Sequence, residues 1–138
     1  MKKTMQACIC ILLALVLTVC FVSCRQGDVW QDATYRQDTE LGSGDKTLTV
    51  EVKVEEHLVV FTLHTDESTV GAALLENGLI AGEEGQYGLY IKVVNGMTAD
   101  YDADGHYWSF CINGEYAMKG VDGTPINEGD TYRLEYAK

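Results

Sequence analysis

The sequence predicts an α+β fold in which one helix packs on a mixed or antiparallel sheet. Three observations predict it. Apolar and polar residues alternate from Leu48 to Val54, apolar residues recur at helical spacing from Val70 to Leu74, and an Asn-Gly pair at 113–114 follows an aromatic run. These patterns are typical of a half-buried strand, an amphipathic helix and a β-hairpin turn, respectively.

The folded part begins with two strands. In "TLTVEVKVE", Leu48, Val50, Val52 and Val54 alternate with polar residues, so one face of this strand is buried and the other is solvated. The segment "LVVFTLH" follows within a few residues. This spacing predicts an antiparallel hairpin that turns near residues 55–58.

The segment "TDESTVGAALLENGLI" predicts a helix of about three turns. Thr65 or Asp66 can cap the first free amide groups of this helix. Val70, Ala73 and Leu74 give it one apolar face, which we expect to pack on the sheet. The Asn-Gly pair that follows provides a left-handed stop.

The second half of the chain predicts four more strands. A turn, "GEEGQYG", precedes the strand "LYIKVVNG", and the strands "HYWSFCI" and "EYAMK" flank the Asn-Gly hairpin. A loop over 120–130 leads to the last strand, "TYRLEYAK". Alternation along "HYWSFCI" places Trp108, Phe110 and Ile112 on one face, and Tyr107, Ser109 and Cys111 on the other. The resulting order, β-β-α-β-β-β-β, fits a β-grasp-like architecture best.

Residues 1–23 are predicted to be a lipoprotein signal peptide. Two lysines precede an apolar run from Ile9 to Val22, which is too short for a typical membrane span. The ending "FVSC" resembles a bacterial lipobox, in which Cys24 receives the lipid and becomes the first mature residue. An uncleaved single-pass anchor and plain secretion are the alternatives. The lipobox favours an exported protein that is lipid-anchored at the outer face of the cell membrane.

The mature chain then divides into two parts. Residues 24–46 are polar, lack periodicity and include a Gly-Ser-Gly run, which predicts a flexible tether. Residues 47–138 carry all the predicted strands and the helix. Their number is in the range of a single domain.

Charge and cysteine placement limit the function classes. Loss of the signal peptide leaves eight basic residues against 21 acidic ones, a net charge of −13. Such a surface repels nucleic acid and anionic lipid headgroups. Cys8, Cys10 and Cys20 lie in the signal peptide and Cys24 is the lipidation candidate, so Cys111 stands alone in the domain. The fold must therefore be held together by its core, without an internal disulfide.

An acidic cluster, "DYDADG", resembles the start of a calcium loop. Asp100, Asp102 and Asp104 occupy positions 1, 3 and 5, and Gly105 occupies position 6. Position 12 falls on Cys111, where an EF-hand needs a bidentate Glu. The cluster is therefore interpreted first as an acidic turn between strands and second as a weak Ca²⁺ site.

No motif of the sequence predicts an enzyme. The serines lack a Gly-x-Ser-x-Gly elbow, the three histidines lack zinc-ligand spacing, and no Gly-rich loop leads from a strand into a helix. Aromatic residues are the remaining functional candidates, because rigid amphipathic rings suit a ligand surface. For Trp108 the alternation favours the core over a contact role. The tentative ligand-binding residues are Tyr101, Tyr107, Trp108, Asn113 and Tyr116.

The helix "STVGAALLENGLI", the "YW" followed by "NG", and the "EGD" before the last strand carry a family resemblance. Together they resemble a domain of unknown function related to the C-terminal domain of transcobalamin and intrinsic factor. The resemblance implies a ligand-binding β-grasp domain, which in the animal members closes over one face of cobalamin. It implies a cell-surface lipoprotein that captures a small ligand, such as a corrinoid, or assists a membrane transporter of vitamins. The alternative is a protein–protein or adhesion module with a calcium-stabilised loop.

Overall fold

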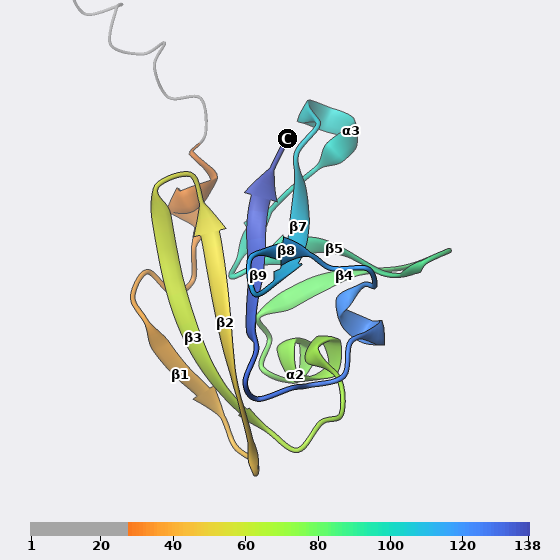
Figure 1. The fold of residues 1–138 in the computed structure, drawn as a ribbon. Coiled ribbons are helices and arrows are strands. Elements are labelled where there is room, and N and C mark those ends of the chain that lie inside the picture. Colours follow the sequence, from red (N-terminus) through yellow and green to blue (C-terminus); the bar gives the residue numbers. More distant parts are fainter. Residues whose placement is uncertain (1–27) are drawn as a thin grey trace, which may run out of the picture. The chain divides into compact units, whose positions relative to one another are not determined.

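The computed structural model describes residues 28–138. The predicted signal peptide and the lipidation residue Cys24 lie outside the described residues. A short 3-10 turn, η1 (Val29–Asp32), comes first, and Asp32–Lys138 form one compact unit (Figure 1). No helix in this part of the chain is long and apolar enough to cross a membrane.

A six-stranded mixed sheet forms the centre of this unit (Figure 1). In spatial order the strands are β1 (Thr39–Gly42), β3 (His57–Thr65), β2 (Lys46–Val54), β9 (Thr131–Ala137), β7 (Tyr107–Ile112) and β8 (Glu115–Tyr116). Strand β1 runs parallel to β3 and strand β2 runs parallel to β9, whereas the other neighbours are antiparallel.

The alternation predicted for the first two strands is confirmed. Leu48, Val50, Val52 and Val54 are buried on one face of β2, and the hairpin to β3 turns at Glu55 and Glu56. Apolar side chains of β3 and β9 complete the buried face: Val59, Phe61, Leu63, Tyr132 and Leu134. The residues between them point to the other, polar face of the sheet.

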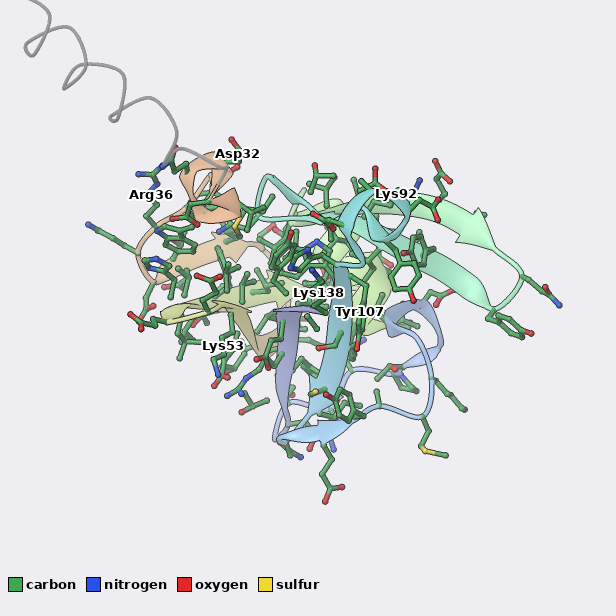
Figure 2. The ribbon with its side chains drawn as sticks, turned by 90° about the horizontal axis from the view of Figure 1, so that it is seen from above. Asp32, Arg36, Lys53, Lys92, Tyr107 and Lys138 are labelled. Carbon is green, nitrogen blue, oxygen red and sulfur yellow. The ribbon has the colours of Figure 1, made fainter. Side chains whose placement is uncertain are left out.

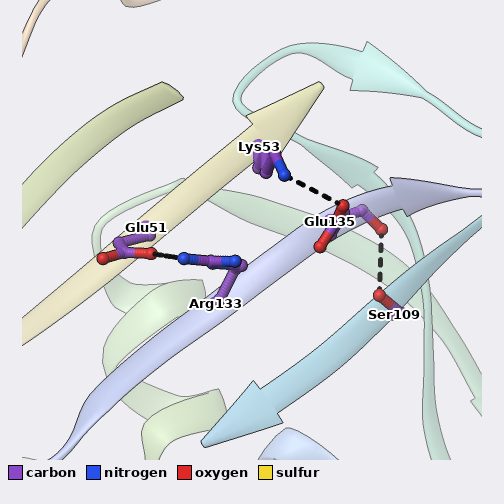
Figure 3. A network of polar contacts seen from close by, with 5 residues as sticks. All are labelled: Glu51, Lys53, Ser109, Arg133 and Glu135. Atoms are coloured by element: carbon purple, nitrogen blue, oxygen red, sulfur yellow. Dashed lines mark hydrogen bonds and ion pairs between the residues drawn. The ribbon is translucent and has the colours of Figure 1, made fainter. Parts of the chain in front are cut away.

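Two ion pairs and a hydrogen bond connect three strands on the polar face (Figure 3). Arg133 Nη2 lies 2.7 Å from Glu51 Oε2, and Lys53 Nζ lies 3.6 Å from Glu135 Oε1. The hydroxyl of Ser109 donates to the backbone oxygen of Glu135 at 3.3 Å. These contacts stabilise the register of β2, β9 and β7, and we assign them no role in ligand binding.

A second, three-stranded sheet corrects one sequence expectation. It contains β4 (Ile80–Gly85), β5 (Gly88–Val94) and β6 (Met97–Thr98). The segment predicted as a turn, 82–88, is largely paired, and the turn itself comprises only Gln86 and Tyr87. The glycine-rich composition obscured this strand because glycine disfavours strands in isolation.

The helix α2 (Val70–Glu76) is shorter than predicted, and its cap differs from both predicted residues. The hydroxyl of Thr69 accepts the N–H of Ala72 at 3.2 Å. Thr65 cannot cap the helix because it ends β3, where its hydroxyl donates to Glu76 Oε2 at 2.7 Å. Two short helical turns complete the inventory of elements: α3 (Tyr101–Asp104) and η2 (Val121–Gly123).

Part of the predicted tether belongs to the folded unit. Within residues 24–46, strand β1 pairs with β3 from Thr39 to Gly42. The ring of Tyr35 meets Phe61 edge-on, with 5.7 Å between the ring centroids. The side chain of Asn95 bonds to the backbone of Tyr35 in both directions, at 2.9 and 2.8 Å. The expectation of a flexible tether is therefore wrong for residues 35–42.

The α+β class is confirmed, with helix α2 set against sheets that are mixed and antiparallel. The element order departs from the expected β-β-α-β-β-β-β. Strand β1 precedes the first predicted strand, β4 and β6 are additional strands on either side of β5, and α3 interrupts the segment between β6 and β7. None of these elements has a periodic apolar pattern of its own.

Candidate functional site

The hairpin that joins β7 to β8 positions the strongest candidate surface. Asn113 and Gly114 both have positive φ angles, of 52° and 85°, as the predicted tight turn requires. The side chain of Asn113 stabilises the fold, because it donates a hydrogen bond to Asp130 Oδ1 and accepts the N–H of Thr131, each at 2.9 Å. This predicted ligand residue therefore holds the turn against the loop that precedes β9.

Two adjacent hollows open beside this hairpin. The first, of about 430 Å³, is lined by residues 112–113, 115–119 and 123–125. The second, of about 460 Å³, lies between Tyr87 at the tip of the β4–β5 hairpin and the loop at 118–123. Both hollows are lined by Met118, Lys119 and Gly123. We call the two hollows together the loop surface.

Exposed apolar side chains surround the loop surface. The exposed fractions are 75 % for Tyr116, 92 % for Tyr87 and 98 % for Met118. Exposed apolar side chains that gather in one patch, rather than singly, often mark an interaction site on a soluble protein. Tyrosine rings and a flexible thioether can together adapt to a flat, amphipathic ligand.

Asp122 fixes the two walls of the loop surface relative to each other. Its carboxylate accepts the N–H of Leu89 near the tip of the β4–β5 hairpin, at 3.2 Å. A Cβ on Gly88 would lie 2.7 Å from this carboxylate, and a Cβ on Gly71 would lie 2.8 Å from the Asp122 backbone. Glycine at both positions thus allows the hairpin, helix α2 and turn η2 to meet at one residue.

The other predicted aromatic residues lie at the opposite end of β7. Tyr107 pairs with Ala137, next to the C-terminal residue Lys138 (Figure 2). Tyr101 meets Tyr107 at 6.4 Å between ring centroids and helps to line a third hollow, of about 410 Å³. Because β7 separates Tyr107 from Ile112 by roughly 17 Å, the five predicted residues do not form one site.

Trp108 belongs to the core. Its exposed fraction is 7 %, and its indole N–H donates to the backbone oxygen of Lys92 at 3.2 Å. The ring also packs beside Tyr136, with 5.3 Å between centroids. The core interpretation of Trp108 is therefore correct, and its inclusion among the ligand contacts is wrong.

The three aspartates do not converge as calcium ligands. Asp100 caps the one-turn helix α3 by accepting the N–H of Ala103 at 3.2 Å. Asp104 accepts the N–H of His106 at 3.0 Å, and this bond is the main reason that the pKa of its carboxyl is lowered. Among residues 28–138, no group of three or more His, Cys, Asp or Glu side chains could hold a metal ion.

His106 and Cys111 are structural side chains. His106 stacks on Tyr136 at 4.5 Å between centroids, and its Nδ1 lies 2.9 Å from Asp104 Oδ1, within ion-pair distance but outside hydrogen-bond geometry. Burial raises the pKa of the Cys111 thiol. A raised pKa suppresses the reactive thiolate form.

Sequence reasoning missed part of the loop surface. Met118, Lys119 and Asp122 lie in a segment without periodicity, and their common neighbour Tyr87 is distant in the sequence. The available signal was the long loop after the Asn-Gly hairpin, since such loops in compact domains are often functional. The contact of this loop with the β4–β5 hairpin is a tertiary feature.

Comparisons with known proteins agree on a family and a fold. The family model described as a domain of unknown function (DUF4430) matches residues 67–138. A solved structure from Ruminococcus gnavus ATCC 29149, of a candidate metal-binding protein, is 34 % identical with a TM-score of 0.64; the alignment covers 68 % of this chain and 98 % of that one. No curated protein sequence matches significantly.

A second solved structure is haptocorrin in complex with Cbi. It is 19 % identical with a TM-score of 0.53, and the alignment covers 71 % of this chain but only 27 % of the haptocorrin chain. At this identity the likeness shows the fold alone. At the level of fold, it confirms the predicted resemblance of this domain of unknown function to the transcobalamin group.

Proposed function

This chain belongs to the DUF4430 family, and from that premise we propose that it is a module that binds a small ligand at the loop surface. The observation that carries the proposal is the set of exposed side chains Tyr87, Tyr116 and Met118 around two adjoining hollows. Ligand sites are concave and mostly apolar, with a few polar groups at defined positions. The loop surface has these properties.

The ligand class we propose is a corrinoid. Haptocorrin, which shares the fold, was solved with Cbi bound. A corrinoid also carries its own metal ion, which accords with the name of the relative from Ruminococcus gnavus. The tyrosine rings and the methionine can contact the flat macrocycle.

The proposal includes a second protein that contacts the bound ligand. Both hollows are open to solvent, so a bound macrocycle keeps one face free for a second protein. We assign this role to a membrane transporter component that takes over the ligand. In this proposal Cys24 carries a lipid that anchors the exported chain at the outer face of the membrane, and the domain keeps a β-grasp-like arrangement.

Calorimetric titration tests the ligand. The chain from residue 25 onward is mixed with cobalamin and with cobinamide, and we expect saturable binding of at least one. Tyr116→Ala should weaken that binding about tenfold. Tyr107→Ala is the matched control, because it removes a tyrosine at the opposite end of β7 and should leave affinity unchanged. Absence of heat with both corrinoids contradicts the proposal.

Metabolic labelling tests the anchor separately. Cells that produce the full chain are given a tagged fatty acid, and we expect the label on the wild type but not on Cys24→Ser. Equal labelling of both proteins contradicts the lipidation of Cys24. The result is independent of ligand binding.

A further inference from the structure

Lys119 provides the cationic group of the loop surface, and we propose that the ligand bound there carries an anionic oxygen group, of the class that includes phosphate esters. This inference rests on the proposed function, because it uses the same surface. It adds to the proposed function the charge of one group of the ligand and the residue that binds this group. Lys119 is singled out by its position, by its lack of a carboxylate partner, and by being the only basic side chain that lines either hollow.

The position of Lys119 is central to the surface. It lines both hollows, together with Met118 and Gly123. Its aliphatic stem runs past Gly123, where an added Cβ would lie 3.7 Å from Lys119 Cβ and 3.8 Å from Cδ. A lysine whose stem lies along the protein surface can place its ammonium group at the edge of an apolar site.

Several other cationic side chains of the described chain have partners outside these hollows. Lys53, Lys92 and Arg133 form ion pairs with Glu135, Glu83 and Glu51, and Lys46 donates to the backbone oxygen of Glu67 at 2.8 Å. Lys119 has no carboxylate partner among the described residues. It is also the only basic side chain among the residues that line the two hollows.

Two acidic residues also line the loop surface. Asp122 lines the second hollow, and its carboxylate accepts the N–H of Leu89. Glu115 lines the first hollow from the β8 side and is exposed. Both carboxylates repel an anionic group of the ligand and Lys119 attracts it, so that group binds close to the ammonium group of Lys119. An ammonium group binds phosphate as a compact point charge.

Two matched ligand pairs test the inference. Cobalamin carries a phosphodiester that cobinamide lacks, and flavin mononucleotide carries a phosphate that riboflavin lacks. We expect Lys119→Met to weaken binding of cobalamin or flavin mononucleotide about fivefold. This loss of affinity corresponds to the free energy of one solvent-exposed ion pair. The phosphate-free partner of each pair should change by less than about twofold. Lys119→Arg should retain the wild-type affinities.

A control variant separates local from overall charge. Lys53→Met removes the same charge from the polar face of the six-stranded sheet, where Lys53 pairs with Glu135, and should leave all affinities unchanged. The effect of Lys119→Met should also shrink at high salt, because counterions screen exposed charges.

The outcomes distinguish the two proposals. If both corrinoids bind and Lys119→Met affects them equally or not at all, the anionic-group inference is overturned and the proposed function stands. If neither corrinoid binds but flavin mononucleotide binds through Lys119, the corrinoid proposal fails and the inference stands. Binding of none of the four probes overturns both.

Discussion

At the residue scale, hydrogen bonding decides which predicted side chains are available to a ligand. The amide of Asn113 bonds to Asp130 and Thr131, and the indole of Trp108 bonds to Lys92. Tyr116 stays 75 % exposed. A residue type that suits a ligand surface suits the core equally well, and partner groups from distant strands decide between the two uses.

The hydrogen bond of Asp122 gives a first prediction. Asp122→Ala removes the acceptor of the Leu89 N–H, and we expect the free energy of unfolding to fall by about 1 kcal/mol. The β4–β5 hairpin should then lose its fixed position, and corrinoid affinity should fall as well. Urea unfolding and calorimetry measure the two effects. Asp102→Ala, at an exposed carboxylate, is the control, and an equal effect of both variants argues against the anchoring role.

A pH dependence follows from Asp104, whose pKa is lowered in the folded state chiefly by the N–H of His106. A lowered folded pKa means that this stabilisation is present above the unfolded pKa, near 3.9. It is lost as the pH falls through the folded value. We therefore expect Asp104→Asn to be less stable than the wild type at pH about 7, and this difference to disappear in acid. Urea unfolding at a series of pH values checks it; a difference that persists in strong acid contradicts the assignment.

At the element scale, the close approach of α2 to η2 forms one end of the loop surface. Gly71 permits it, since an added Cβ would lie 2.8 Å from the backbone of Asp122. Gly71→Ala should therefore lower the free energy of unfolding by about 1–3 kcal/mol, despite alanine's higher helix propensity. Thermal melting measures this. Gly129→Ala, where an added Cβ would lie 4.0 Å from Asn127 Oδ1, an ordinary contact distance, should change stability little; similar losses for both variants count against a clash at Gly71.

The one-turn helix α3 gives a prediction about calcium. Asp100 and Asp104 already accept backbone N–H groups, and the described residues contain no group of three metal-ligating side chains. We expect the melting temperature to be the same with calcium as with a chelator. A bound ion must stabilise the folded state by mass action, so a calcium-dependent rise restores the calcium-site hypothesis.

At the scale of the whole molecule, the C-terminal half of the predicted tether completes the sheet. Strand β1 covers one edge of β3, and Tyr35 packs on Phe61. Removing residues up to 45 exposes that edge, and we expect a loss of about 2 kcal/mol or more in the free energy of unfolding. A chain that starts at residue 32 should keep wild-type stability. Equal stability of both truncated chains shows that β1 contributes nothing to the fold.

Local pattern was sufficient for much of the fold. The alternation in β2 and β3, the apolar face of α2 and the Asn-Gly turn at 113–114 were all predicted, because each depends on residues close together in the sequence. Strand β1 and the extent of β4 were not predicted. Each is stabilised by pairing with a partner strand, against a composition that disfavours strands.

The sequence by itself determined the α+β class, the half-buried strands, the hairpin and the acidic charge. Only the tertiary structure decided that Tyr107 and Tyr116 lie at opposite ends of β7, and that Tyr87 faces Met118 across a hollow. The physical reason is the distance along the sequence over which each effect acts. Periodicity and turn chemistry act over a few residues, whereas a site is formed where distant segments meet, and that meeting depends on how the sheets pack.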